Sequence, residues 1–183
     1  YVTNGNFTGN TDSWLVGQPL MGGTEVLASL PSHGWSYGND NVVATNVEQF
    51  KSLIQHDIPI IGGKAYTISV DISNFSGTGD LTPVIVDNAG YWTRPGRPDY
   101  VGGQNISYQQ YAVDSDGTWT WTLRASVGYS ANQEVAWTPP GWVPYLPNQL
   151  YFQNRADTSG GSNKLNCTID NISVKSVNSS CIV

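Results

Sequence analysis

The stretch Lys64-Ala-Tyr-Thr-Ile-Ser-Val-Asp-Ile72 decides the fold class. Every second residue in it is apolar, and the residues between are mostly polar. Strict alternation over this length is typical of a β-strand with one face buried and the other solvated. Gly62-Gly63 before the stretch and residues 74–79 after it are rich in turn-forming residues. The stretch therefore predicts a half-buried antiparallel strand bounded by turns.

Similar strand signals recur along the chain, whereas helical periodicity is nearly absent. The further expected strands cover residues 25–30, 50–60, 81–86, 118–127, 149–155 and 168–177. Asp116-Gly117 is a turn signal directly before one of them. We therefore predict an all-β fold of about eight or more strands in two packed antiparallel sheets, a jelly-roll sandwich.

The 183 residues are expected to form a single sandwich domain interrupted by two long aromatic-rich loops, residues 87–112 and 128–148. Loops of this length are uncommon in compact domains and are often functional. They contain seven of the aromatic residues that a binding surface would use: Tyr91, Trp92, Tyr100, Tyr108, Trp137, Trp142 and Tyr145.

Composition limits the classes of function. The net charge is −6, and the four lysines and four arginines are scattered. Nucleic-acid binding needs a basic face, so we exclude it. No apolar run approaches the roughly 20 residues that span a bilayer. The chain begins at Tyr1 rather than Met, so we expect a cleaved leader or a fragment of a longer protein.

Several features suggest an extracellular or surface-exposed protein. Charged residues are 12% of the chain, and Gly, Ser, Thr and Asn are abundant. Six Asn-X-Ser/Thr sequons would be glycosylation sites in a eukaryotic secreted glycoprotein: Asn6, Asn74, Asn105, Asn166, Asn171 and Asn178. Such a setting favours a disulfide between Cys167 and Cys181, and the alternative is two free thiols.

Three segments together resemble the jelly-roll carbohydrate-binding modules attached to many bacterial xylanases and glucanases, which are galactose-binding-like β-sandwiches. Asn4-Gly-Asn-Phe7 with Trp14-Leu-Val-Gly17 is similar to the opening strand, turn and tryptophan of that family. Residues 62–70 resemble its central strand, and Ile169-Asp-Asn-Ile-Ser-Val174 resembles its closing strand. The resemblance spans nearly the whole chain and implies the same sandwich.

The resemblance also implies a structural calcium ion, held by Asp170 of the closing strand with Asn6 and a position at Thr24 or Glu25. Oxygen ligands of this kind suit Ca²⁺. By its position we expect Asp170 to share a face with Ile172 and Val174 and to point toward the core or its rim. The alternative is that Asp170 accepts backbone N–H groups from the first loop.

Glycan binding needs aromatic rings that stack on pyranose rings, flanked by amide, hydroxyl and carboxylate groups. Two places supply both kinds of group. One is the polar sheet face, with Tyr151, Gln153, Arg155, Asp71 and Arg124; the other is the loop set, with Trp92, Trp137 and Trp142. For Trp14, Trp119 and Trp121 we expect core packing instead. For Trp137 and Trp142 a local cap over a sheet edge is an equal alternative.

Catalysis is not expected. His33 and His56 stand in different contexts, and no nucleophile, zinc or phosphate-loop motif occurs. The sequence thus predicts a non-catalytic extracellular glycan-binding module. The alternative is a structural subunit of an extracellular assembly, such as a virion surface or a filament, in which Trp137 and Trp142 grip the next copy.

Overall fold

The computed structural model describes residues 2, 5–8, 13–19, 25–86, 88, 92–93, 112–125, 148–154 and 163–177, with side chains omitted at a few of these positions. The described residues form eleven strands and no helix. The strands are β1 (Trp14–Pro19), β2 (Glu25–Ala28), β3 (Trp35–Tyr37), β4 (Val42–Val47), β5 (Ser52–Gln55), β6 (Ala65–Gly77), β7 (Leu81–Val86), β8 (Trp92–Thr93), β9 (Gly117–Arg124), β10 (Gln149–Asn154) and β11 (Leu165–Ser176).

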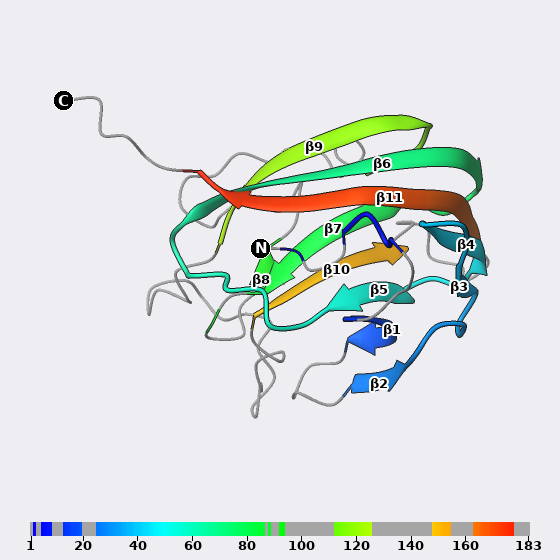
Figure 1. Cartoon of the computed structure of the whole chain (residues 1–183), viewed down its shortest axis with the longest axis horizontal. Helices are drawn as coiled ribbons and strands as arrows, with labels where there is room; N and C mark the ends of the chain where they lie inside the picture. The colour runs from blue at the N-terminus through cyan, green and yellow to red at the C-terminus, as the bar shows by residue number, and fades with distance from the viewer. Residues whose placement is uncertain are drawn as a thin grey trace, which may run out of the picture.

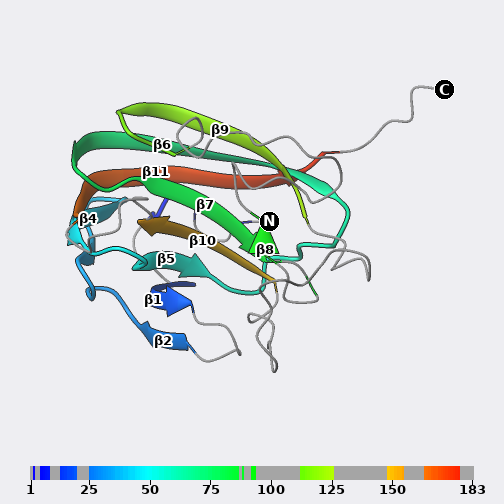
Figure 2. The same cartoon turned by 180° about the vertical axis from the view of Figure 1, so that it is seen from behind.

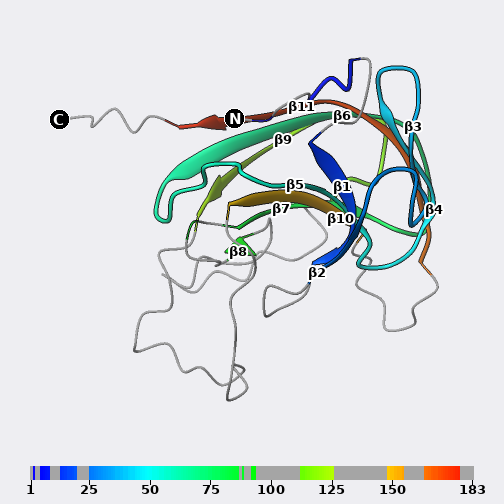
Figure 3. The ribbon, with the colours of Figure 1, turned by 60° about the horizontal axis from the view of Figure 1, so that its bottom comes forward.

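The strands form two antiparallel sheets that pack face to face, as Figures 1 and 2 show from opposite sides and Figure 3 from an oblique direction. Among the described residues, the six-stranded sheet has the order β2-β1-β5-β10-β7-β8 and the five-stranded sheet the order β3-β4-β11-β6-β9. Leaving β8 aside, consecutive strands from β4 onward alternate between the sheets. The predicted all-β antiparallel sandwich is confirmed.

The core lies between the sheets and takes every second residue of the facing strands. Tyr66, Ile68, Val70 and Ile72 of β6 are all buried there, as their alternation predicts. Trp14 and Trp121 are buried in the same cluster, and Trp119 packs against it partly exposed. The expected core role of these three tryptophans is confirmed.

One strand prediction had the wrong extent, and another strand, β4, was missed. The expected strand over residues 50–60 shortens to Ser52–Gln55, because Phe50 and Asp57 on either side have positive φ angles of 64° and 60°. β4 was not predicted at all, since Val42-Val-Ala-Thr-Asn-Val47 lacks clear alternation. Past Ile169, which pairs with Val42 at the start of β4, residues 5–8 take the place of β4 beside β11, and the Ile172 N–H donates to the Gly5 carbonyl at 2.8 Å.

Tyr66 fixes the connection from β5 to β6. Its ring is buried in the core, and its hydroxyl accepts the Ile61 N–H at 2.8 Å and donates to the Pro59 carbonyl at 3.3 Å. These bonds hold Ile58 and Ile60 in the core. A buried hydroxyl that both donates and accepts avoids the cost of leaving a polar group unpaired.

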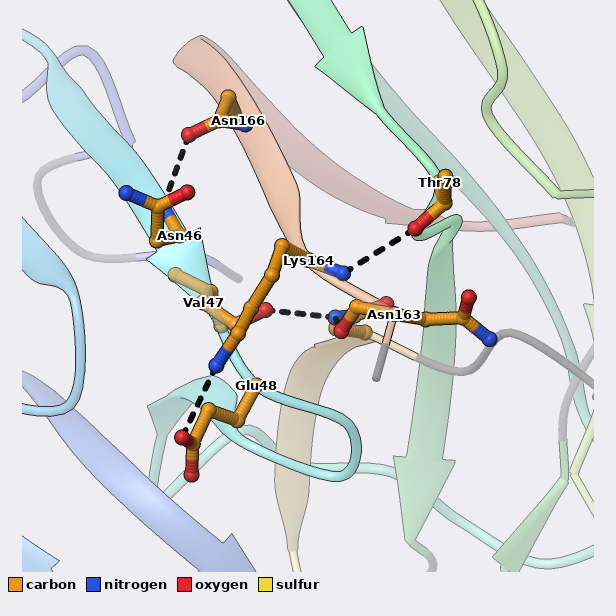
Figure 4. A network of polar contacts seen from close by, with 8 residues as sticks. Asn46, Val47, Glu48, Thr78, Asn163, Lys164 and Asn166 are labelled. Carbon is orange, nitrogen blue, oxygen red and sulfur yellow. Dashed lines mark hydrogen bonds and ion pairs between the residues drawn. The ribbon is translucent and has the colours of Figure 1, made fainter. Parts of the chain in front are cut away.

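Polar contacts join two chain turns to the neighbouring parts of β10 and β11 (Figure 4). The buried Asn154 amide donates to the Val47 carbonyl at 2.7 Å. Lys164 pairs with Glu48 at 2.9 Å, and this bond and charge hold the pKa of Glu48 below its ordinary value. The Lys164 backbone N–H donates to the Thr78 hydroxyl at 3.4 Å. The contacts tie the β4–β5 and β6–β7 turns to the ends of β10 and β11.

A β-bulge in β11 changes which residues face the core. Buried residues follow a step of two up to Ile169 and resume at Ile172, and the register against β6 shifts between Asp170 and Ser173. Asn171 at the bulge has a φ of 50°. Asp170 therefore lies on the solvent face, and the prediction that it shares the face of Ile172 and Val174 is wrong. A single extra residue inverts the two faces of a strand.

We predict that the bulge depends on the left-handed conformation of Asn171. Asn171→Val should lower the free energy of unfolding by about 1–2 kcal/mol more than Asn171→Gly, because a β-branched residue is strained at positive φ. Both variants lose the Asn171 side chain, so the difference between them isolates the backbone term. Urea denaturation of the two variants measures it, and equal stabilities would contradict this account of the bulge.

Candidate binding face

Three neighbouring strands of the six-stranded sheet, β5, β10 and β7, are buried on both faces. The described side chains of β5, β7 and β10 are all buried. In most antiparallel sandwiches the outer face of each sheet is solvated. The residues of this outer face, called the Tyr151 face below, are Ser52, Ile54, Thr82, Val84, Val86, Gln149, Tyr151 and Gln153.

Strand register sets the neighbours of Tyr151. Tyr151 pairs with Ile54 of β5 on one side and with Val84 of β7 on the other. These three residues form an apolar cluster with Val86, separate from the main core, and Leu27 packs against it. An aromatic ring thus lies between two aliphatic side chains in one row across the sheet.

The rows beside this cluster are polar. Gln153 pairs with Ser52 and with Thr82, which places one amide between two hydroxyl groups. On the other side, the Gln149 amide lies 3.2 Å from the His56 ring nitrogen Nδ1. The Gln153 amide also donates to the Phe50 carbonyl at 3.5 Å. The Tyr151 face therefore combines an aromatic ring with neutral donors and acceptors.

The outcome for Tyr151 and Gln153 is mixed. They lie on the sheet face opposite the core, as predicted. Their expected exposure is wrong, since only 4% of Tyr151 and 6% of Gln153 is accessible to solvent. Alternation of residue type identifies the two faces of a strand, but it does not reveal whether the second face is covered.

Asp71 and Arg124 lie on the other sheet. Both occupy the outer face of the five-stranded sheet, Asp71 on β6 and Arg124 at the end of β9. They therefore do not share a face with Tyr151 and Gln153, and the prediction of one polar face is corrected to two on opposite sides of the sandwich. Trp92 takes the register position opposite Val86. Arg155, Trp137 and Trp142 lie outside the described residues, as do most of the two predicted loops.

Two aspartates face each other across β6 and β11. Asp71 and Asp170 are direct register partners, and like charges in such pairs destabilise a sheet. Asp71 accepts hydrogen bonds from the Thr118 hydroxyl at 2.6 Å and the Asn171 amide at 2.9 Å. Asp170 accepts the Asn171 N–H at 2.7 Å. None of the hydrogen bonds or ion pairs described for these two carboxylates involves a basic side chain.

No contact between Asn6 and Asp170, two members of the predicted calcium set, is described, but their chain segments are neighbours. Residues 5–8, which include Asn6, contact β11 at Ile172, two residues from Asp170. Thr24 lies outside the described residues. The described residues contain no cluster of three or more His, Cys, Asp or Glu side chains suited to a metal ion. The oxygen chemistry and the outward carboxylate of Asp170 fit calcium, and the site stays a prediction.

Cys167 is buried in the core and is a free thiol. Val177 continues the β11 ladder, since its N–H donates to the Ala65 carbonyl. The ten residues from Cys167 to Val177 therefore span about 30 Å. The four residues from Val177 to Cys181 reach at most about 14 Å, and disulfide bonding needs Cα atoms within about 7 Å. The predicted Cys167–Cys181 bond is wrong for any chain that keeps β11 intact.

Comparisons with known proteins find matches among solved structures alone. No family model matches it, and no curated protein does. One similar structure is the N-terminal cellulose-binding domain of Cellulomonas fimi β-1,4-glucanase C, with 17% identity, 96% coverage of both chains and a TM-score of 0.48. Another, described as "CBM4 structure and function", has 13% identity, covers 97% of this chain and 100% of that one, and has a TM-score of 0.49.

The resemblance to carbohydrate-binding modules expected from sequence thus has a counterpart in solved structures over nearly the whole chain. At these identities and TM-scores the similarity concerns the fold alone. In the described part of the chain there is no helix of the length and hydrophobicity that a membrane span requires.

We predict that Cys167 is inert in the folded protein. Burial, with a smaller contribution from the charge of Asp116, raises the pKa of its thiol to about 12. Only the thiolate reacts rapidly with alkylating agents. Peptide mass spectrometry after iodoacetamide treatment at pH 8 should find Cys167 unlabelled in the native protein and labelled in guanidinium chloride. Labelling of native Cys167, or a bridged Cys167–Cys181 peptide, would contradict the assignment.

Proposed function

We propose that the chain is a non-catalytic glycan-binding module that acts outside the cell, and that the Tyr151 face is its binding surface. The observation that supports this most is the row of Ile54, Tyr151 and Val84 beside the row of Ser52, Gln153 and Thr82. A pyranose ring has an apolar face, which stacks on an aromatic ring, and a rim of hydroxyl groups, which pair with amides and hydroxyls.

The chemistry of the face indicates the class of glycan. None of its eight described residues is charged. A uronic acid or sulfated sugar would find no cationic partner among these eight residues, and burying an unpaired charge is costly. We therefore propose a neutral polysaccharide as the ligand.

The burial of Tyr151 has a consequence for affinity. A glycan reaches the ring only in molecules whose Tyr151 face is exposed. The apparent dissociation constant is therefore the intrinsic one divided by the fraction of molecules with an exposed face. Association that requires such a change is also slower than association with a preformed surface. We expect stopped-flow association rates well below the diffusion limit.

The absence of catalysis is part of the proposal. Asp71 and Asp170 form the closest pair of carboxylates that strand register establishes, and both lie on the outer face of the five-stranded sheet. A glycosidase needs one carboxyl group in an environment that keeps it protonated, across a cleft from the other. Release of reducing sugar by the pure chain, abolished by one carboxylate substitution, would overturn the proposal.

We predict that Tyr151→Ala weakens binding of neutral oligosaccharides by about 1–3 kcal/mol, the effect of losing an aromatic contact. Isothermal titration with cello-, xylo- and manno-oligosaccharides measures the change. Tyr151→Phe should retain most of the affinity, because it keeps the ring. Tyr37→Ala, an exposed tyrosine of the five-stranded sheet, is the matched control and should bind as the parent does.

Because Tyr151 is buried, Tyr151→Ala should also lower the free energy of unfolding by about 3–5 kcal/mol. The titration must therefore be run where circular dichroism shows the variant folded. Equal affinity in folded Tyr151→Ala and the parent would exclude the Tyr151 face. No binding of any glycan, together with large particles in light scattering that Trp137→Ala or Trp142→Ala abolishes, would favour the structural subunit instead.

Calcium is the second part of the proposal, with Asp170 and Asn6 among its ligands. Calcium that binds only the folded chain raises stability by about 2.7 kcal/mol at a hundredfold excess over its dissociation constant. Thermal melts with calcium and with EDTA should differ, and Asp170→Asn should remove the difference. Asp114→Asn, in the turn before β9, is the control. Identical melts and no calcium in metal analysis would remove calcium from the proposal.

A further inference from the structure

No described strand pairs with the outer edge of β9. β9 pairs with β6 on one side only and ends the order of the five-stranded sheet. It is eight residues long and contains no proline, in the sequence Gly117-Thr-Trp-Thr-Trp-Thr-Leu-Arg124. Long regular edges of this kind pair readily with another strand unless they are covered or interrupted.

Two backbone hydrogen bonds show which residues of β9 direct their backbone N–H and C=O groups away from β6. The Ala125 N–H donates to the Lys64 carbonyl at 2.8 Å, so odd-numbered residues of β9 bond to β6. On β6, the Ala65 carbonyl accepts from Val177, which directly follows β11, so the even-numbered residues of β6 bond to β9. Both observations identify the same residues of β9 whose backbone N–H and C=O groups point away from β6: Thr118, Thr120, Thr122 and Arg124.

These four residues are exposed, and no hydrogen bond in the described structure uses their outward N–H or C=O groups. Threonine also has a high strand propensity. The edge therefore presents four donors and four acceptors at regular spacing, in a backbone that is already extended.

We propose that β9 pairs antiparallel with β9 of a second copy of this chain, which joins two five-stranded sheets into one. In the register that uses every outward residue, Thr120 of each copy faces Thr122 of the other, and Thr118 faces Arg124. The two-fold axis then passes beside Trp121. Such a contact is isologous and closes on itself.

Charge complementarity selects this register and this partner. Thr118 is the register partner of Asp71, which in turn faces Asp170. Arg124 of the second copy would therefore lie two strand spacings, about 10 Å, from the Cα atom of Asp71. The two side chains together span that distance. Each copy would place the only charged group of its edge beside the two opposed carboxylates of the other copy.

If the register between the two copies of β9 shifts toward Arg124, the ion pair between Arg124 and Asp71 is lost. The shift moves Arg124 away from Asp71 and finally brings the two arginines face to face, which is unfavourable. Arg124 makes no ion pair with any described residue of its own chain. The interface involves few residues, so it falls below the size of permanent complexes, and dimer formation depends on concentration.

Sedimentation velocity of the intact chain, from micromolar to millimolar concentration in EDTA, tests the proposal. We expect a monomer–dimer equilibrium. Thr120→Pro removes the outward N–H at the centre of the edge and should weaken the dimer about a hundredfold, while the bonds to β6 remain. Thr120→Val keeps the N–H and the strand propensity, and should dimerise as the parent does.

Arg124→Glu should weaken the dimer about tenfold, because it turns two ion pairs into repulsions. Combining it with Asp71→Lys should restore dimerisation, and this result does not depend on how well Thr120→Pro folds. Amide exchange followed by NMR should show Thr118, Thr120 and Thr122 protected only at high concentration. A monomer at all concentrations, or a dimer indifferent to both Thr120→Pro and Arg124→Glu, would overturn the proposal.

Discussion

The ladder between β6 and β11 is the contact from which the rest of the sandwich is built. These are the two longest strands, and they lie at the centre of the five-stranded sheet, with β4 and residues 5–8 on one side and β9 on the other. Their inward residues form much of the core. The bulge at Asn171 keeps both halves of β11 in contact with that core and turns Asp170 outward.

The second constraint is the burial of both faces of the six-stranded sheet at β5, β10 and β7. Its inner face packs on the β6–β11 side of the core, and its outer face buries a tyrosine and two glutamines. Buried amides need hydrogen-bond partners, and the side-chain nitrogens of Gln149 and Gln153 have them at His56 and Phe50. Exposing this face has a free-energy cost, which the proposed neutral ligand would have to offset.

The two proposed surfaces are physically independent. The Tyr151 face belongs to the six-stranded sheet, and the β9 edge belongs to the five-stranded sheet. Pairing through β9 would leave the Tyr151 face of each copy free, so a dimer would present two glycan sites. Linked sites raise overall avidity for a polymeric ligand without any new contact to it. A weak single site and a weak dimer would then reinforce one another on a polysaccharide.

The sequence by itself determined the fold class and the faces of the regular strands. Alternation in residues 64–72 and 149–155 identified which side chains face the core, because the side-chain period of a strand is two. The buried tryptophans of β1 and β9 followed from the same rule. Low charge and the lack of a basic cluster excluded nucleic-acid binding without any structure.

Only the tertiary structure decided the rest. A bulge is invisible in a pattern of residue types, so Asp170 was assigned to the wrong face until its register with Asp71 was known. Two polar faces from different sheets looked like one, since periodicity does not say which sheet a strand joins. Whether Cys167 can reach Cys181 depends on the length of β11. The burial of Tyr151 depends on what contacts the Tyr151 face. The free edge of β9 is likewise a property of strand order, which arises from contacts between residues far apart in the chain.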